Sequence, residues 1–182
     1  MDAITLLLTR RSSAALQAPA PDGVALETIL RAALRVPDFQ ELRPYEFIIA
    51  QGEGLQRLGA MMERAAIASG QPPDIVKRAP RMPLRAPLVI VVVAKARDSV
   101  VVHPLEQQMT AGCAVMAMQM AAFAQGFGGI WRSGWAMFDR GLHIELGLED
   151  RDQIVGFLYL GTPSALPTQA QDVDPKAHVR HL

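Results

Sequence analysis

Two arginines and two serines follow one another at residues 10–13 and form a compact set of anion-binding side chains. Guanidinium groups match phosphate oxygens in shape and charge, and hydroxyls can donate to the oxygens that remain. Arg10, Arg11 and Ser12 therefore indicate a phosphate site. Taken alone the signal is weak, because arginines at a helix end are usually solvated or contact the terminal carbonyls.

A second group of chemically useful residues comes after the glycine-rich run at 126–129. Trp131, Arg132 and Ser133 place an aromatic ring, a cation and a hydroxyl side by side. The glycines themselves do not make a dinucleotide fingerprint, because that motif follows a strand and opens a helix, whereas this run follows a predicted helix.

Other kinds of chemistry find little support. His103 and His143 have no adjacent nucleophile, and no GxSxG motif or pair of acids appears, so a hydrolase is not indicated. His178 and His181 lack the acid or thiol that would complete a metal site, and no metal is expected. Cys113 is the only cysteine. It cannot form an intrachain disulfide and is expected to be a buried small hydrophobe.

The composition fits one globular domain over residues 1–182, with 50% hydrophobic residues and equal numbers of basic and acidic ones. A net charge of zero provides no global attraction to nucleic acid or to an anionic membrane. The N-terminus places an acid before a short apolar run and cations after it, the reverse of a secretory signal. We therefore expect a cytoplasmic protein.

The elements that must position the two groups follow from periodicity and breakers. The segment 71–87 contains five prolines and several cations, which indicates an irregular cover or broken helix. The run 88–94 is continuously apolar and β-branched, as expected of a central strand buried on both faces. Helices are predicted at 3–9, 24–36, 52–70 and 142–146, and further strands at 47–50, 130–133 and 154–160.

One predicted helix leads directly into the glycine-rich run that precedes Trp131, Arg132 and Ser133. From Ala111 to Ala124 only Gly112 and Gln119 interrupt the apolar residues, so the helix should be buried all round. It is too short to cross a bilayer. Its small residues allow another backbone to approach closely, which suits a core helix or a subunit interface.

These residues converge on a known family. RRS at 10–12, RPY at 43–45, RAPLVIVVVAK at 85–95, the block EQQMTAGCAVMAMQMAAFAQGFGGIWRSG at 106–134 and IVGFLYLGTP at 154–163 closely resemble the nitroreductase family, in particular its short bacterial YdjA-like branch. The resemblance implies an α+β fold with a mostly antiparallel sheet flanked by helices. It also implies an intertwined homodimer with two FMN sites at the interface.

The resemblance further assigns residues to the cofactor. Arg10, Arg11 and Ser12 would hold the FMN phosphate and ribityl chain, and Trp131, Arg132 and Ser133 would line the same FMN. Arg35 would reach in from the partner chain, and the ring of Phe39 could border the isoalloxazine. A nicotinamide could lie at the end of the long helix, along Ala121, Ala122, Phe123, Ala124, Gln125 and Gly126, where core packing is the alternative.

The implied reaction is hydride transfer from NADH or NADPH through FMN to a nitroaromatic or quinone-like acceptor, with ping-pong kinetics and no catalytic acid or base. This sequence departs from the branch at Phe39 and Gln40, where relatives typically have His and Lys. It departs from many broader members at Ala14, where they carry a cation. An FMN-binding dimer with little turnover, another flavin reaction on the same fold, and a structural dimer without cofactor remain as alternatives.

Overall fold

A five-stranded sheet forms the centre of the computed structural model, which describes residues 1–165 and 173–182. β3 (Leu88–Ala94) and β5 (Gln153–Pro163) pair in the middle, with β2 (Glu46–Gln51) along the free side of β3. β4 (Gly128–Arg132) pairs with the other side of β5, and the short β1 (Leu16–Gln17) continues that side. All four pairings are antiparallel, so the expected α+β class with an antiparallel sheet is confirmed.

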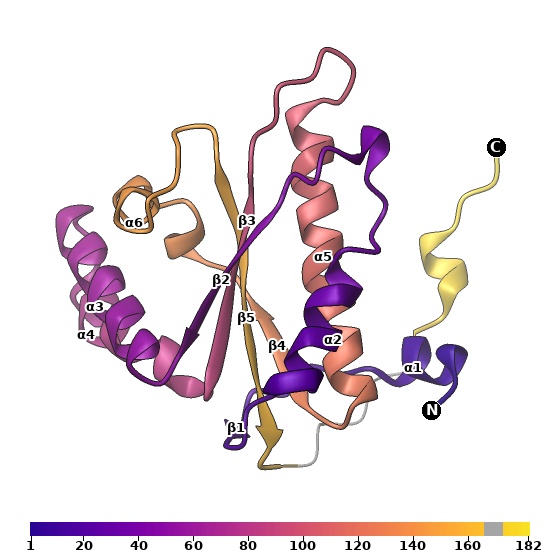
Figure 1. Ribbon diagram of the computed structural model, residues 1–182, viewed down its shortest axis with the longest axis horizontal. Helices are drawn as coiled ribbons and strands as arrows, with labels where there is room; N and C mark the ends of the chain where they lie inside the picture. The colour runs from indigo at the N-terminus through magenta and orange to yellow at the C-terminus, as the bar shows by residue number, and fades with distance from the viewer. Residues whose placement is uncertain (166–172) are drawn as a thin grey trace.

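The sheet separates two hydrophobic cores because successive side chains of a strand point to opposite faces. All seven residues of β3 are buried, as the β-branched run predicted. Val89, Val91 and Val93 face α3 (Glu53–Ala68) and α6 (Arg140–Glu145), whereas Leu88, Ile90 and Val92 face α2 (Gly23–Ala33) and α5 (Pro104–Ala124). Figure 1 shows these two helical layers on either side of the strands.

The proline-rich segment 71–87 is a broken helix, as predicted. It forms α4 (Pro73–Arg78), η2 (Ala79–Arg81) and η3 (Pro83–Arg85). A close approach fixes it to α3, since a Cβ built at Gly59 would lie 2.3 Å from the carbonyl oxygen of Pro80. The segment is therefore held against the sheet layer by backbone contact, and its arginines are carried to the end of β4.

The long helix α5 is only partly buried, so the prediction of burial all round is wrong for the single chain. Met109 is 62% exposed, and Cys113, expected to be buried, is exposed as well. The reason is geometric: the sheet and α2 cover one side of α5, whereas α1 and the chain at Pro37 touch it elsewhere without covering Met109 and Cys113. None of the described helices combines the length and apolarity needed to cross a membrane.

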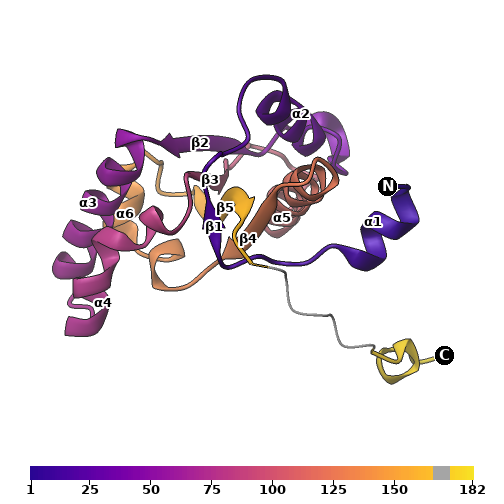
Figure 2. The same cartoon turned by 90° about the horizontal axis from the view of Figure 1, so that it is seen from below.

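Both ends of the chain lie on the α5 side of the molecule, away from α3 and α4 (Figures 1 and 2). α1 (Ala3–Thr9) begins after Asp2 as predicted, because that carboxylate accepts hydrogen bonds from the backbone N–H groups of Ile4 and Thr5. Its Leu8 is 78% exposed. Residues 173–182, with η5 (Pro175–His178), are exposed throughout.

One helix end differs from its prediction, and one predicted segment lies partly outside the described residues. α2 ends at Ala33 rather than at Val36, and Leu34, the next residue, is 54% exposed. The predicted polar tail, 164–182, falls partly on residues 166–172, which are outside the described residues.

Candidate cofactor site

The first predicted segment, residues 10–13, lies beside the start of β4. The backbone N–H of Ser13 donates to the carbonyl oxygen of Gly129 at 2.9 Å. Gln119 of α5 is 3% exposed and donates from its amide nitrogen to the same oxygen at 2.8 Å and to the Ser12 hydroxyl at 3.5 Å. This buried amide explains the polar interruption in an apolar helix, because it ties α5, β4 and residues 12–13 together.

Two glycines let these elements meet. A Cβ at Gly128 would lie 2.8 Å from a methyl of Leu16 and 3.0 Å from the Ser13 Cβ, and a Cβ at Gly129 would lie 2.9 Å from Leu160. Any side chain at these positions would push residues 12–16 or the strand away. The glycine-rich run therefore serves close packing at the start of β4.

The second predicted segment occupies the other end of β4, and its indole is fixed in a slot. The Trp131 Nε1–H donates to the carbonyl oxygen of Val155 at 3.1 Å. A Cβ at Gly156 would lie 1.9 Å from Nε1, and one at Gly112 would lie 3.6 Å from the far edge of the ring. Glycines on β5 and α5 thus make room for the ring, which remains 40% exposed.

Arg132 points to the opposite face of the sheet. Its guanidinium carbon lies 5.5 Å from the centre of the Tyr159 ring, a cation–π distance. Burial raises the pKa of the Tyr159 phenol, and the charges of Arg132 and Arg85 oppose that rise. The Arg132 Nε is buried and has no hydrogen-bond partner among the described residues. A buried donor of this kind is unusual and indicates a missing acceptor.

A cavity of about 550 Å³ opens next to this arginine. Its walls come from α4, η3 and the end of β4. Trp135 Nε1 of η4 (Trp135–Met137) belongs to the same lining and is a second buried donor with no partner among the described residues. None of the described residues that line it is acidic. Those residues are Ile75, Arg78, Met82, Arg85, Ile130, Trp131, Arg132, Ser133, Gly134 and Trp135.

β4 therefore connects the two predicted segments. Residues 12–13 lie at its start and Trp131, Arg132 and Ser133 at its end, and four residues of extended chain span about 13 Å. Such a spacing suits a ligand with an anionic group at one end and a flat ring at the other. Sequence reasoning missed Arg78 and Arg85, for which the only signal was the concentration of cations in the proline-rich cover.

Arg35 and Phe39 are not brought to this place. They lie in the chain that leads into β2, at the edge of the sheet opposite β4. Arg35 lines a separate cavity of about 310 Å³ with Arg43, and Phe39, which is 64% exposed, lines a groove beside α5 that also contains Cys113. Within one chain, these residues and Arg132 do not share a site.

The loop that carries Phe39 has an unusual backbone. Gln40, Glu41 and Arg43 have φ angles of 65°, 51° and 48°, a region that side chains other than glycine rarely adopt. A carboxylate oxygen of Asp38 accepts the Arg43 N–H at 2.7 Å and helps to hold this turn. Strained loops of this kind are concentrated at functional sites.

The residues considered for a nicotinamide, 121–126, close α5. Ala122 is fully buried in the core beside α2, and Gln125 donates to the carbonyl oxygens of Ala121 and Ala25. Ala124 and Gly126 are exposed. Packing accounts for Ala122, whereas the exposed end of the helix is open to a ligand.

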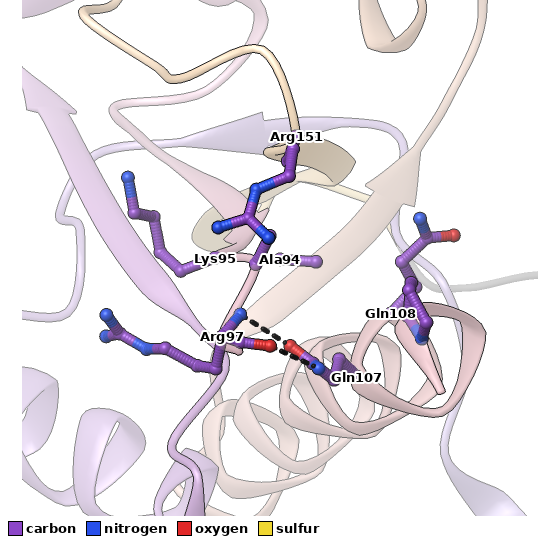
Figure 3. A pocket seen from close by; sticks show the side chains of 8 residues that line it. Ala94, Lys95, Arg97, Gln107, Gln108 and Arg151 are labelled. Carbon is purple, nitrogen blue, oxygen red and sulfur yellow. Dashed lines mark hydrogen bonds between the residues drawn. The ribbon is translucent and has the colours of Figure 1, made fainter. Parts of the chain in front are cut away.

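A further cavity of about 270 Å³ lies near the start of α5 (Figure 3). The Gln107 side chain accepts from the Arg97 N–H at 2.8 Å and donates to the Arg97 carbonyl at 2.9 Å, which clamps the chain after β3 to the helix. Lys95 pairs with the buried Asp152 at 2.5 Å, and this hydrogen bond raises the pKa of Lys95. These contacts hold the chain that follows β3 against α5 and Asp152, so we assign them a structural role.

Comparison with known proteins identifies the family and the fold. The model of the Nitroreductase family matches residues 7–162. The chain is 48% identical over 183 residues to the Escherichia coli K12 protein named "Putative NAD(P)H nitroreductase YdjA", with all of both chains covered. A nitroreductase-like family protein from Bacillus cereus shares the fold with a TM-score of 0.84 at 19% identity, covering 100% of this chain and 96% of the other. A Bacteroides fragilis nitroreductase with bound FMN aligns with a TM-score of 0.73 at 19% identity, covering 95% and 96%. The chain belongs to the nitroreductase family.

Proposed function

We propose that this protein is an FMN-dependent oxidoreductase that passes a hydride from NADH or NADPH to a nitroaromatic or quinone-like acceptor. The observation that carries the proposal is the hydrogen bond between Ser13 and Gly129, which brings the chain segment of Arg10 and Arg11 to the start of the strand whose other end carries Arg132. Family membership and the NAD(P)H nitroreductase name of the E. coli relative support the same reaction.

The donor set fits FMN chemically. A phosphate dianion needs several charge-assisted donors, and Arg10, Arg11 and Ser12 supply them. At the other end, the buried Arg132 Nε lacks an acceptor among the described residues, and a flavin carbonyl or ring nitrogen is an acceptor of the required kind. Trp131 and Ser133 complete the lining beside the ring.

When bound, FMN supplies the hydride chemistry, and the protein binds, orients and tunes it. Arg132 would stabilise negative charge that develops on the ring. The Arg132 guanidinium lies over the face of the Tyr159 ring, which helps to hold it in position. No side chain need act as acid or base. Because donor and acceptor would use one pocket in turn, we expect ping-pong kinetics. The exposed end of α5 at 124–126 adjoins the start of β4, the phosphate end of the proposed site, and not the end that would hold the ring.

We further propose that the active form is a homodimer. Arg35 and Phe39 lie at the sheet edge opposite β4, so they can join the site containing Arg132 only from a second chain. The uncovered side of α5, with Met109 and Cys113, and the exposed apolar residues of α1 offer a surface for that chain. Exposed large apolar side chains gathered on one surface are typical of an interaction site.

The test is spectroscopic. Purified protein is incubated with FMN, passed through gel filtration, and reduced without oxygen by NADH and by NADPH in separate samples. We expect retained flavin absorbance that bleaches with a nicotinamide and returns when a nitroaromatic or quinone is added. A yellow protein that neither nicotinamide bleaches would contradict the enzyme proposal, and a colourless protein that takes up no FMN would contradict the cofactor as well.

A further inference from the structure

Two arginines in the cavity beside β4 have no role in the proposed cofactor site. Arg78 ends α4 and Arg85 ends η3, so both come from the proline-rich cover rather than from residues 10–13 or the end of β4. Both side chains are exposed, whereas Arg132 is partly buried. The cavity thus has one cation in its floor and two toward solvent.

The electrostatics of this cavity are one-sided. Arg78 pairs with Asp74, whose carboxylate lies 3.5 Å away in an exposed pair one helical turn apart. Exposed pairs of this kind contribute little and are readily exchanged for another anion. Arg85 and Arg132 form no ion pair within residues 1–165 and 173–182.

The walls between these cations are apolar. Ile75 and Met82 come from the cover, and Ile130 and Trp135 come from the sheet side. The Trp135 Nε1 adds a buried donor that has no acceptor among the described residues. A flat aromatic molecule with a negatively charged substituent matches both features, because its ring can contact the apolar walls while its charge faces the arginines.

We infer that Arg78 and Arg85 select an anionic electron acceptor, an aromatic compound with a carboxylate. This inference rests on the proposed function, since it names the acceptor class for the same pocket. A dinucleotide donor or the flavin could also meet these arginines, and the test separates the three. The expected consequence is a preference for a charged acceptor over its neutral isostere.

The kinetic arm compares 4-nitrobenzoate with 4-nitrobenzamide, which has a similar shape and no charge. We expect the wild-type enzyme to favour nitrobenzoate in kcat/KM, and Arg85→Gln and Arg78→Gln each to lower the ratio of the two values by about tenfold, the size expected from losing a partly solvated charge-assisted hydrogen bond. The matched control is Arg81→Gln, on the same segment but outside the cavity lining.

An equilibrium arm does not depend on turnover. The protein has two tryptophans, Trp131 and Trp135, and both line the cavity. Nitroaromatics quench indole fluorescence, so titrating FMN-saturated protein with each compound reports binding at this place, with free tryptophanamide as correction for absorbance. We expect tighter binding of nitrobenzoate, lost by about tenfold in Arg85→Gln and kept in Arg81→Gln.

Three results would overturn the inference. Equal wild-type binding of the two compounds would show that the cations do not select charge. A weaker FMN affinity in Arg85→Gln than in Arg81→Gln would assign the arginine to the cofactor. A slower reduction by NADH or NADPH in Arg78→Gln and Arg85→Gln would assign them to the donor. If the wild-type protein takes up no FMN, the proposed function fails, and the fluorescence titration of the cofactor-free protein still decides the charge preference.

Discussion

The slot that holds Trp131 makes a quantitative prediction about Gly156→Ala. The added Cβ would lie 1.9 Å from the indole Nε1 and 2.5 Å from Cδ1, and its three nearest neighbours all belong to Trp131. The ring must therefore move, and its hydrogen bond to the Val155 carbonyl is lost. Gly156 lies in β5 opposite Val92, in a central strand that cannot shift to relieve the clash.

The magnitude follows from three contributions. Overpacking costs about 1–3 kcal/mol. The lost hydrogen bond costs about 1 kcal/mol. Alanine regains about 0.5–1 kcal/mol over glycine in a strand. We expect Gly156→Ala to lower the free energy of unfolding by about 1–3.5 kcal/mol in total.

A double-mutant cycle isolates the cause. In a Trp131→Ala background the clash is absent, so Gly156→Ala should stabilise the protein by about 0.5–1 kcal/mol. Urea unfolding followed by circular dichroism, at one fixed protein concentration, measures both values. The change of sign is the result that matters: if Gly156→Ala costs the same in both backgrounds, the indole does not occupy this slot.

Two further predictions concern stability and assembly. Asp152 is buried and accepts hydrogen bonds from Lys95 and from the N–H groups of Glu149 and Ala96. Asp152→Asn should therefore lower the free energy of unfolding by about 2–4 kcal/mol. The control, Asp98→Asn, removes an exposed ion pair with Arg151 and should lower it by less than about 1 kcal/mol. Burial alone would raise the pKa of Asp152, but these hydrogen bonds outweigh it and lower the pKa below 3.8. The ionised Asp152 should therefore stabilise the fold above that pH, and its contribution should be lost as the pH falls through the lowered pKa. When the free energy of unfolding is measured against pH, Asp152→Asn should show a smaller loss in acid than the wild type. On α5, Met109→Glu should convert the proposed dimer into monomers, as measured by analytical ultracentrifugation. Ile67→Glu on α3, at an equally exposed position, should leave the dimer intact. Dimers in both variants would exclude the α5 side as the interface.

Some of this architecture could be read from the sequence and some could not, for identifiable reasons. The run 88–94 predicted a central strand correctly because a continuous β-branched segment is stable only when both faces are covered. Burial of α5 was overestimated because an apolar pattern requires cover but does not say which chain supplies it. Cys113 was misassigned for the same reason.

Some residues of the candidate site could likewise be predicted from the sequence and others could not. Arg10 and Arg132 were singled out because their neighbours made chemically coherent groups, and the structure adds the pairing of Ser13 with Gly129 that joins the segments. Arg78 and Arg85 were missed because the proline-rich cover has no periodicity from which its path could be predicted. In the proposed homodimer Phe39 would join the site from a second chain, which a single sequence pattern cannot place.

The central claim is that residues 10–13 and the end of β4 hold one FMN, and a flavin titration tests it most directly. FMN is titrated into the wild-type protein, Arg10→Ala and Arg132→Ala, with Arg57→Ala on the exposed surface of α3 as control. Each site variant should lower FMN affinity by about 1.5–3 kcal/mol, the range for a charge-assisted hydrogen bond, and the control should match the wild type. Unchanged FMN affinity in both Arg10→Ala and Arg132→Ala would contradict the account.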